Sequence, residues 1–328
     1  MEEENNILRE TVAEFCEKNL DEKIIETEGI GKKLTDLIAS QGFLGSIIPD
    51  KYSGSGLDET SYEIILEEVA KYSPSIAMKI FLLNSMYYPA VRNTPAESTL
   101  TDASTGRIST AVDFINKQAN VKTSAGKING EIKSILGSDS DKLIIFHDGT
   151  SIVSGPFRSE SRDFMGFRGL KFGDLLLDNS FQNLESEIKL PEIMEKSYGA
   201  ASAIALGMIS GALQKAIEYT NVRKAFGNKL RDFEPVSFRL ARFKSTETIL
   251  RNSLYSKVDP YYTFNFAMEH LVEIARYSVN THGGYGYFKD FGVEKFYRDA
   301  IVMKSIFYGT EEIRKLTEHV YSEKINFV

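Results

Sequence analysis

The 328-residue sequence predicts a mainly helical α+β protein made of three consecutive segments. Three observations support this: helical periodicity up to about residue 105, short β-rich runs from 106 to 188, and a return to helical patterning from 189 to 328. We therefore expect an N-terminal helical domain, a small antiparallel β domain and a C-terminal helical bundle, in that order. The chain length agrees with two or three domains.

The first segment contains a clear amphipathic pattern. In SYEIILEEVAKY, the apolar residues Ile65, Val69 and Tyr72 recur at steps of four and three, which is typical of one helix face. Ser73-Pro74 predicts an interruption, because the residue before a proline avoids the helical region. The preceding stretch GFLGSIIPDKYSGSGLD, residues 42–58, has four glycines and one proline, so we expect a loop held to the core by its apolar residues.

The middle segment changes to β patterning. Asn129-Gly130 and Asp148-Gly149 each lie between short β-rich runs, and both pairs predict two-residue hairpin turns, since these residues tolerate positive φ. Arg168–Leu177, RGLKFGDLLL, predicts a further strand.

The last segment opens with GAASAIALGMISGAL, which is rich in alanine, glycine and serine. Small side chains let helices approach closely, so we expect this helix to be central and buried. The next predicted helix begins at Val236 and carries an apolar stripe broken by Glu247. A third helix is predicted over residues 263–281.

Composition excludes several classes of function. Cys16 is the single cysteine, so no internal disulfide can form, and the sequence fits a cytoplasmic setting. The four histidines show no metal-ligand spacing, and we expect no metal centre. A net charge of −7 argues against nucleic-acid binding. The acidic start is unlike a signal peptide, and we expect no membrane span.

The segment NVRKAFGNKL, residues 221–230, has two interpretations. Arg223 can bind phosphate through its guanidinium, and Phe226 can cover a flat cofactor. Alternatively, the basic residues offset a helix dipole and Gly227 ends the helix.

Two further motifs follow. THGGYGYFKDFGVEKFYRDA, residues 281–300, has glycines that let a ligand approach the backbone, but no strand precedes it, so a Rossmann site is not expected. Its alternative is a turn between helices, with Glu294 and Arg298 as an i,i+4 pair. IFYGTEEIRK then predicts a helix start, with Thr310 as a hydroxyl N-cap.

Taken in order, these segments resemble the acyl-CoA dehydrogenase family over nearly the whole chain. GFLGSIIPDKYSGSGLD is similar to the family pattern GxxGxxxPexyGGxGld, and RKAFG, GGYGY with VEKFYRDA, and GTEEIR match its C-terminal motifs. The resemblance implies a C-terminal four-helix bundle and FAD bound between the β domain and these helices. It also implies an acyl-CoA substrate and a homodimer or homotetramer in which FAD reaches a subunit interface.

The resemblance assigns several cofactor-binding residues. Arg223 and Phe226 correspond to the pair that reaches the FAD of a neighbouring subunit. Asn280 stands at the position of a family glutamine that, with the following glycines, contacts the adenosine-pyrophosphate part of FAD. These glycines are Gly283, Gly284 and Gly286, and Thr310 corresponds to the threonine near the flavin.

The positions of the family's catalytic base carry other residues. Tyr308 stands where a glutamate most often precedes the Gly-Thr pair, and Ser197, followed by Tyr198, stands at the alternative position. A phenol with a pKa near ~10 and a serine hydroxyl are poor bases at neutral pH. Glu195 and Glu311 are weak substitutes, because Glu195 is expected on a different helix face and Glu311 lies past the glycine.

The middle segment also differs from the family. RISTAVDFINKQ lacks the TEPxxGSD loop, SILG at 134–137 replaces the flavin-lining WITN, and Phe233-Glu234 replaces a phenylalanine–glutamine pair. The residues assigned to the pyrophosphate remain.

Three functions follow from the resemblance. The first is FAD-dependent α,β-dehydrogenation of an acyl-CoA. The second is a catalytically silent homologue or a non-catalytic subunit that shares a flavin site with a catalytic paralogue. The third is flavin-dependent oxygen chemistry, for which the sequence gives no positive support.

Overall fold

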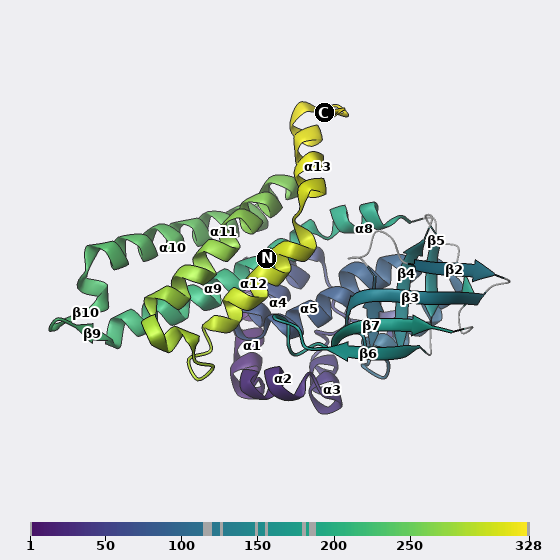
Figure 1. The fold of residues 1–328 in the computed structure, drawn as a ribbon, viewed down its shortest axis with the longest axis horizontal. Coiled ribbons are helices and arrows are strands. Elements are labelled where there is room, and N and C mark those ends of the chain that lie inside the picture. Colours follow the sequence, from purple (N-terminus) through teal and green to yellow (C-terminus); the bar gives the residue numbers. More distant parts are fainter. Residues whose placement is uncertain are drawn as a thin grey trace.

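Helices from both ends of the chain pack together, and most strands gather at one side of them (Figure 1). The computed structural model describes residues 2–113, 120–124, 127–147, 150–154, 157–178, 182–183 and 188–326. Its architecture is the predicted mainly helical α+β fold, with helices, then a β region, then helices.

The N-terminal helices are short, and two of them are joined by a π-helical stretch. They are α1 (Glu2–Asn19), α2 (Glu22–Glu28), α3 (Lys32–Ser40), α4 (Glu59–Tyr72), α5 (Pro74–Phe81), η2 (Leu82–Tyr87, π-helical), α6 (Tyr88–Val91) and α7 (Leu100–Ser104), with 3₁₀ turns at η1 (Asp50–Tyr52) and η3 (Pro95–Thr99).

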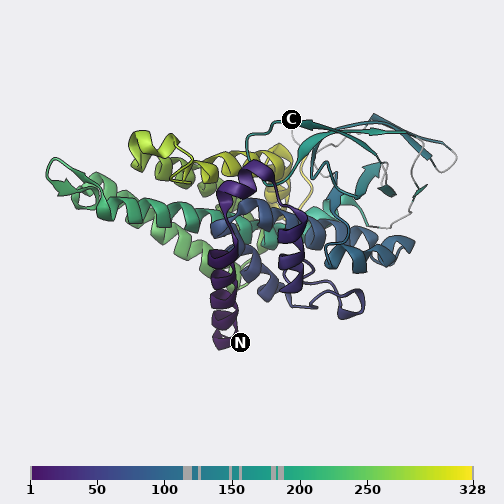
Figure 2. The same cartoon turned by 90° about the horizontal axis from the view of Figure 1, so that it is seen from below.

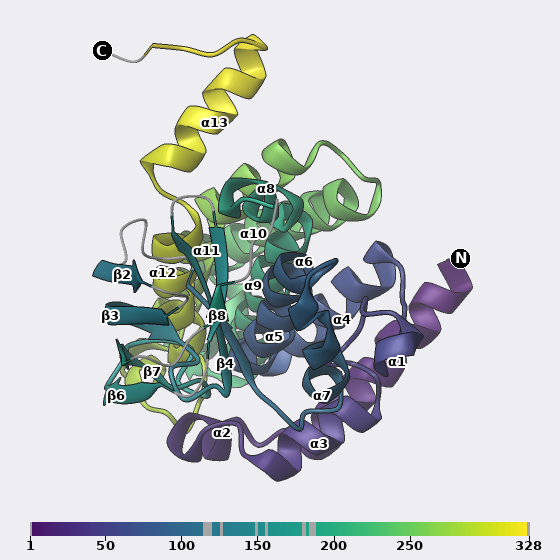
Figure 3. The ribbon, with the colours of Figure 1, turned by 90° about the vertical axis from the view of Figure 1, so that its right-hand side faces the viewer.

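The C-terminal helices are longer. They are α8 (Leu190–Lys196), α9 (Tyr198–Val222), α10 (Glu234–Tyr255), α11 (Pro260–Thr281), α12 (Glu294–Phe307) and α13 (Thr310–Tyr321), with 3₁₀ turns at η4 (Leu230–Asp232) and η5 (Gly283–Tyr287). Figure 3 shows α13 extending away from the other helices. It is tied to the start of α11 by His319, whose Nε2 lies 2.7 Å from the Asp259 carboxylate.

The strands of the β region form two four-stranded sheets. They are β1 (Thr110–Val112), β2 (Asn120–Ser124), β3 (Lys127–Leu136), β4 (Lys142–His147), β5 (Thr150–Ser154), β6 (Arg158–Arg162), β7 (Phe172–Leu177) and β8 (Gln182–Asn183). The orders are β1-β4-β5-β8 and β2-β3-β7-β6, and an apolar cluster that includes Ile132, Leu143 and Leu175 forms a core of its own. The pairs are antiparallel as predicted, except that β1 runs parallel to β4.

One turn prediction for the β region is wrong, and one predicted strand is confirmed as β7 but begins later than expected. Asn129-Gly130 is not a turn but lies inside β3, where Gly130 faces Val121 on one side and Leu177 on the other. The strand predicted from residue 168 begins at Phe172, because the preceding backbone bonds to helices instead: Gly169 accepts from Ile30 N–H and donates to the Ser75 hydroxyl. The other predicted turn, Asp148-Gly149, lies outside the described residues.

Helix α9 is central and buried, as its small residues predict. It packs so closely on α4 that a Cβ added at Gly207 would lie 2.2 Å from the Glu67 carbonyl oxygen. At Gly211 the added atom would lie 2.6 Å from the Lys71 carbonyl oxygen. Among the described helices, α9 is the one long and apolar enough to cross a membrane by length and composition, but most of its apolar window is buried inside the protein.

A buried carboxylate joins α1, α4 and α10. The side chain of Glu67 is fully buried, and its oxygens lie 2.7 Å from Arg9, 2.6 Å from Arg251 and 2.6 Å from the Tyr255 hydroxyl. Burial alone would raise its pKa, but Arg251, Arg9 and Lys71 hold the pKa of Glu67 at about 2. The glutamate therefore stays ionised and holds three helices together.

Cys16, on α1, is fully buried, and burial raises the pKa of its thiol to about 12.

Residues of α12 hold the segment before β7 against the helices. The Asp299 carboxylate accepts a hydrogen bond from Phe167 N–H, and Arg298 donates to the Met165 carbonyl at 2.8 Å. Arg298 also lies 2.6 Å from Glu26 on α2 and 3.2 Å from Glu294, so the predicted i,i+4 pair is present. Burial raises the pKa of Asp299 to about 7, although the hydrogen bond from Phe167 opposes this.

Asp299 gives the protein a pH-dependent term in its stability. The folded state binds a proton at Asp299 more tightly than the unfolded state does. This proton binding therefore stabilises the folded state fully below about pH 4, and the stabilisation is lost as pH rises towards 7. The variant Asp299→Asn keeps an oxygen for Phe167 N–H and cannot ionise. We expect its free energy of unfolding, relative to wild type, to rise by about 2–3 kcal/mol between pH 5 and pH 8.

Urea denaturation at both pH values measures this difference. The control is Asp163→Asn, since Asp163 is an exposed aspartate, and it should follow the wild-type pH dependence. Identical pH slopes for Asp299→Asn and wild type would show that the buried carboxyl does not titrate as described.

Candidate functional site

A pocket of about 500 Å³ lies where the ends of α9 and α11 meet η5. The structure brings four of the predicted cofactor-binding residues to its wall: Arg223, Asn280, Gly283 and Gly284. The rest of the lining is formed by Tyr219, Leu230, Thr281, His282, Tyr285 and Phe288. The Arg223 guanidinium lies 5.5 Å from the centre of the Tyr285 ring.

The local fold explains how Arg223 reaches this wall. Helix α9 ends at Val222, and the chain turns back through β9 (Lys224–Ala225) and β10 (Asn228–Lys229). The prediction that Gly227 ends the helix is therefore wrong: Phe226 and Gly227, at φ 50° and 85°, form the tip of a hairpin. In Figure 2 this hairpin, coloured green, projects from the end of the helices that lies opposite the β region.

Phe226 is placed differently from the other predicted cofactor residues. It does not line the pocket, and its side chain is 96% exposed at the hairpin tip. Single exposed apolar side chains are common on protein surfaces, so the exposure of Phe226 assigns it no role by itself.

The glycines near the pocket have distinct physical roles. Gly283 has φ 59°, and a Cβ added at Gly283 or Gly284 would meet nothing within 4 Å, so their backbone is open to the pocket. Gly286 is buried, and an added Cβ would lie 2.3 Å from the Val279 carbonyl oxygen. Gly286 is therefore required by packing. An open backbone beside a guanidinium can bind phosphate oxygens, so these residues fit the pyrophosphate part of a dinucleotide.

Tyr308 lies at the other end of α11. It follows the last residue of α12, its hydroxyl donates to the Asn265 side chain, and its ring centre lies 6.0 Å from that of Phe264. Burial and the neighbouring Glu269 carboxylate raise the pKa of Tyr308 to about 12. The phenol is therefore protonated at neutral pH and cannot accept a proton.

Ser197 occupies the junction of α8 and α9. It is buried, and its hydroxyl donates to the Met194 carbonyl at 2.7 Å. The next residue, Tyr198, is also buried and stacks on Phe264 with ring centres 4.4 Å apart. Phe264 contacts both Tyr198 and Tyr308, so the residue after Ser197 and the residue before Gly309 belong to one aromatic cluster.

The weaker base candidates lie elsewhere. The Glu195 carboxylate is 3.6 Å from the Lys315 ammonium, and Glu195 lines a second pocket, of about 400 Å³, together with Gly199. Glu195 belongs to the last turn of α8, whereas Gly199 belongs to the first turn of α9, on either side of the junction residue Ser197. Glu311 is exposed in the first turn of α13.

Thr310 does not cap α13 as predicted. Gly309 is the N-cap residue, and its N–H donates to the Glu312 carboxylate at 2.9 Å. Thr310 is exposed in the first turn of the helix.

Glu63 was not predicted as a functional residue, yet it is a buried carboxylate that lines the pocket of Glu195 and Gly199. Burial raises its pKa to about 7, against the effect of the Lys257 ammonium 2.8 Å away. The one sequence feature that points to Glu63 is that it is an acidic residue among the apolar residues of α4. Its burial results from the packing of α9, which is distant in the sequence. Its carboxylate approaches the start of α9: a Cβ added at Gly199 would lie 2.5 Å from Glu63 Oε1.

The flavin-lining segment of the family is locally distorted here. The β3–β7 register shifts between Ile132 and Ile135, and Ser134 has φ 64° with its N–H bonded to Asp174 at 3.0 Å. A β-bulge of this kind redirects side chains at the edge of a site.

The two groups of candidate residues are well separated within one chain. Tyr308 contacts Asn265 near the start of α11, whereas Asn280 lies near its end. Fifteen helical residues span about 22 Å. One chain therefore presents a phosphate-type pocket at one end of α11 and the vacant base positions at the other.

Comparisons with known proteins match most of the chain to one family. Residues 2–97 match the family model "Acyl-CoA dehydrogenase, N-terminal domain", and residues 195–260 and 264–318 match "Acyl-CoA dehydrogenase, C-terminal domain". The chain is 25% identical to the 3-(aryl)acrylate reductase of Clostridium sporogenes, over 96% of this chain and 97% of the relative. It is also 25% identical to the caffeyl-CoA reductase-Etf complex subunit CarC of Acetobacterium woodii, with 96% and 97% covered.

A solved structure supports the same conclusion for the fold. The butyryl-CoA dehydrogenase of Megasphaera elsdenii superposes with a TM-score of 0.84 at 23% identity, covering 97% of this chain and 98% of that one. From the motifs, the fold and the two matched family domains together, we conclude that the chain belongs to the acyl-CoA dehydrogenase family of FAD flavoproteins.

Proposed function

We propose that this chain binds FAD but does not perform the α-proton abstraction of a working acyl-CoA dehydrogenase. One observation carries the proposal: both positions of the usual base hold hydroxyls that donate hydrogen bonds, Tyr308 to Asn265 and Ser197 to Met194. With its pKa raised to about 12, the Tyr308 phenol holds its proton. Two described carboxylates near these positions are already paired: Glu269, beside Tyr308, lies 3.6 Å from the Lys304 ammonium, and Glu195 lies 3.6 Å from that of Lys315, so we propose that neither acts as the base.

The cofactor site that we propose is built from two copies of the chain. FAD accepts hydride when bound, and the open backbone at Gly283 and Gly284 beside Arg223 would hold its pyrophosphate. Since this pocket lies about 22 Å from Tyr308 along α11, we propose that it holds the FAD whose flavin serves a neighbouring chain. The exposed Phe226 tip would contact that neighbour.

A second function is favoured by the same features. A non-catalytic subunit would retain the residues that reach a neighbour's cofactor while losing its own base. Arg223 and the glycine segment are present here, and Tyr308 replaces the base. The partner is then either another copy, in a homodimer or homotetramer, or a catalytic paralogue in a cytoplasmic hetero-oligomer. If active, the chain would oxidise an acyl-CoA.

Flavin binding is tested through Arg223. In the variant Arg223→Gln the charged contact to a phosphate is lost, and we expect the dissociation constant for FAD to rise about 10-fold. Fluorescence titration of apoprotein with FAD measures this constant. Arg92→Gln, at an exposed arginine after α6, is the matched control and should bind like wild type. An unchanged constant in Arg223→Gln would remove this residue from the site.

The proposed lack of a general base at position 308 is tested by introducing a carboxylate there. FAD-loaded wild type should keep its absorbance near ~450 nm on anaerobic mixing with acyl-CoAs of several chain lengths. Tyr308→Glu should bleach at least ~100-fold faster, which is the usual effect of a general base. Tyr308→Gln, of the same size and without a base, is the control. Bleaching by wild type, or equal rates in the glutamate and glutamine variants, would contradict the proposal.

A further inference from the structure

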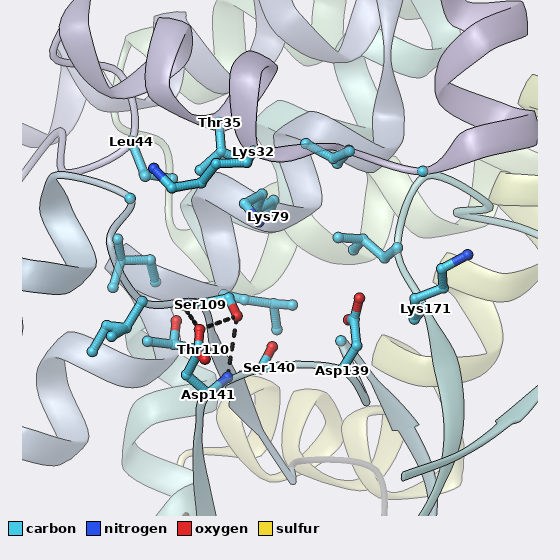
Figure 4. Close-up of a pocket in the computed structure, with 18 of the residues that line it drawn as sticks. Lys32, Thr35, Leu44, Lys79, Ser109, Thr110, Asp139, Ser140, Asp141 and Lys171 are labelled. Atoms are coloured by element: carbon cyan, nitrogen blue, oxygen red, sulfur yellow. Dashed lines mark hydrogen bonds between the residues drawn. The ribbon is translucent and has the colours of Figure 1, made fainter.

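A separate cavity of about 320 Å³ lies between the N-terminal helices and the β region (Figure 4). Its walls come from the start of α3, from α5 and η2, from residues 106–110 and from the turn between β3 and β4. None of the residues assigned above to catalysis or to FAD lines it, and the SILG segment contributes only Gly137.

Lys79 supplies a charge to the inner part of this cavity. It projects from α5, and Leu44, Leu82 and Leu83 contribute to the same lining. Within the part of the chain that the structure describes, no hydrogen bond or ion pair joins the Lys79 ammonium to another residue. Burial lowers its pKa, and the more distant carboxylates of Asp139 and Asp141 oppose this only in part. An unpaired ammonium in such surroundings destabilises a protein.

The other charged groups around the cavity are engaged or exposed. Asp141 accepts hydrogen bonds from the Ser109 N–H and hydroxyl at 2.7 and 2.8 Å. Lys32 is paired with Asp36, and Arg107 lies 3.1 Å from Asp102. Asp139 and Lys171 are exposed. Lys79 is therefore the charge left to bind a ligand that enters the cavity.

The start of α3 adds to the attraction for an anion. Gly31 is its N-cap residue and provides no side-chain cap, and Gly31 and Lys32 both line the cavity. Uncapped N–H groups at a helix start favour negative charge. This effect reinforces that of Lys79, which projects from a different helix.

We propose that this cavity binds a small organic acid, with its carboxylate or phosphate paired to Lys79 and its apolar part against Leu44, Leu82 and Leu83. The volume is at the lower end of the ~300–1,000 Å³ typical of ligand sites, so the ligand is small. The site is distinct from the FAD pocket and does not depend on the chain having dehydrogenase activity.

The test compares the thermal stability of the full chain with and without anions. Sodium butyrate, sodium hexanoate and sodium phosphate are added, each against sodium chloride of equal ionic strength. For wild type we expect at least one of these anions to raise Tm by about 2–5 °C, saturably. Butyrate and hexanoate report a carboxylate site, and inorganic phosphate reports a phosphate site.

The variant Lys79→Met removes the charge and keeps the length of the side chain. It should fold with Tm equal to or above that of wild type, because a partly buried unpaired charge is removed, and should lose the anion-dependent rise. Lys171→Met, at the exposed lysine, is the control and should keep that rise. The proposal is overturned if no anion raises the Tm of wild type beyond chloride, or if Lys79→Met gains as much as wild type.

Discussion

The close approach of α4 and α9 is the constraint on which the rest of the helical structure depends. At Gly207 and Gly211 the backbone of α4 occupies the space that a side chain would need. Because of this contact α4 is buried on nearly every side. Its buried glutamates therefore need cationic partners to remain ionised. Glu67 finds Arg9 and Arg251, and Glu63 finds Lys257. The ion pairs of the core therefore depend on the close packing of α4 and α9 that Gly207 and Gly211 allow.

The same helix fixes the geometry of the candidate site. Its first residues, Ser197 and Tyr198, reach the aromatic cluster around Phe264, and its last residue leads into the Arg223 hairpin. Because α9 is rigid and central, the vacant base positions and the phosphate-type pocket are held at a set separation. In the arrangement that we propose, the flavin site therefore combines surfaces of two chains.

How much could be predicted from the sequence depends on the range of the interactions involved. The buried α9 was predictable, since small residues recur along it, and so was the order of helices and strands. Local turn signals failed where distant contacts prevailed: Asn129-Gly130 is paired on both sides within β3. Gly227 sits in a hairpin tip and not at a helix end. Lys79 could not be recognised, because the cavity around it is assembled from segments far apart in the chain.

The buried thiol of Cys16 has a practical consequence. As the single cysteine, fully buried and with its pKa raised to about 12, it leaves the native protein with no thiolate that reagents in solution can attack. A cysteine placed at the exposed tip in the variant Phe226→Cys would therefore carry a fluorophore, spin label or cross-linker at one defined point. The wild-type background therefore adds no unwanted labelling to spectroscopic distance measurements between protomers.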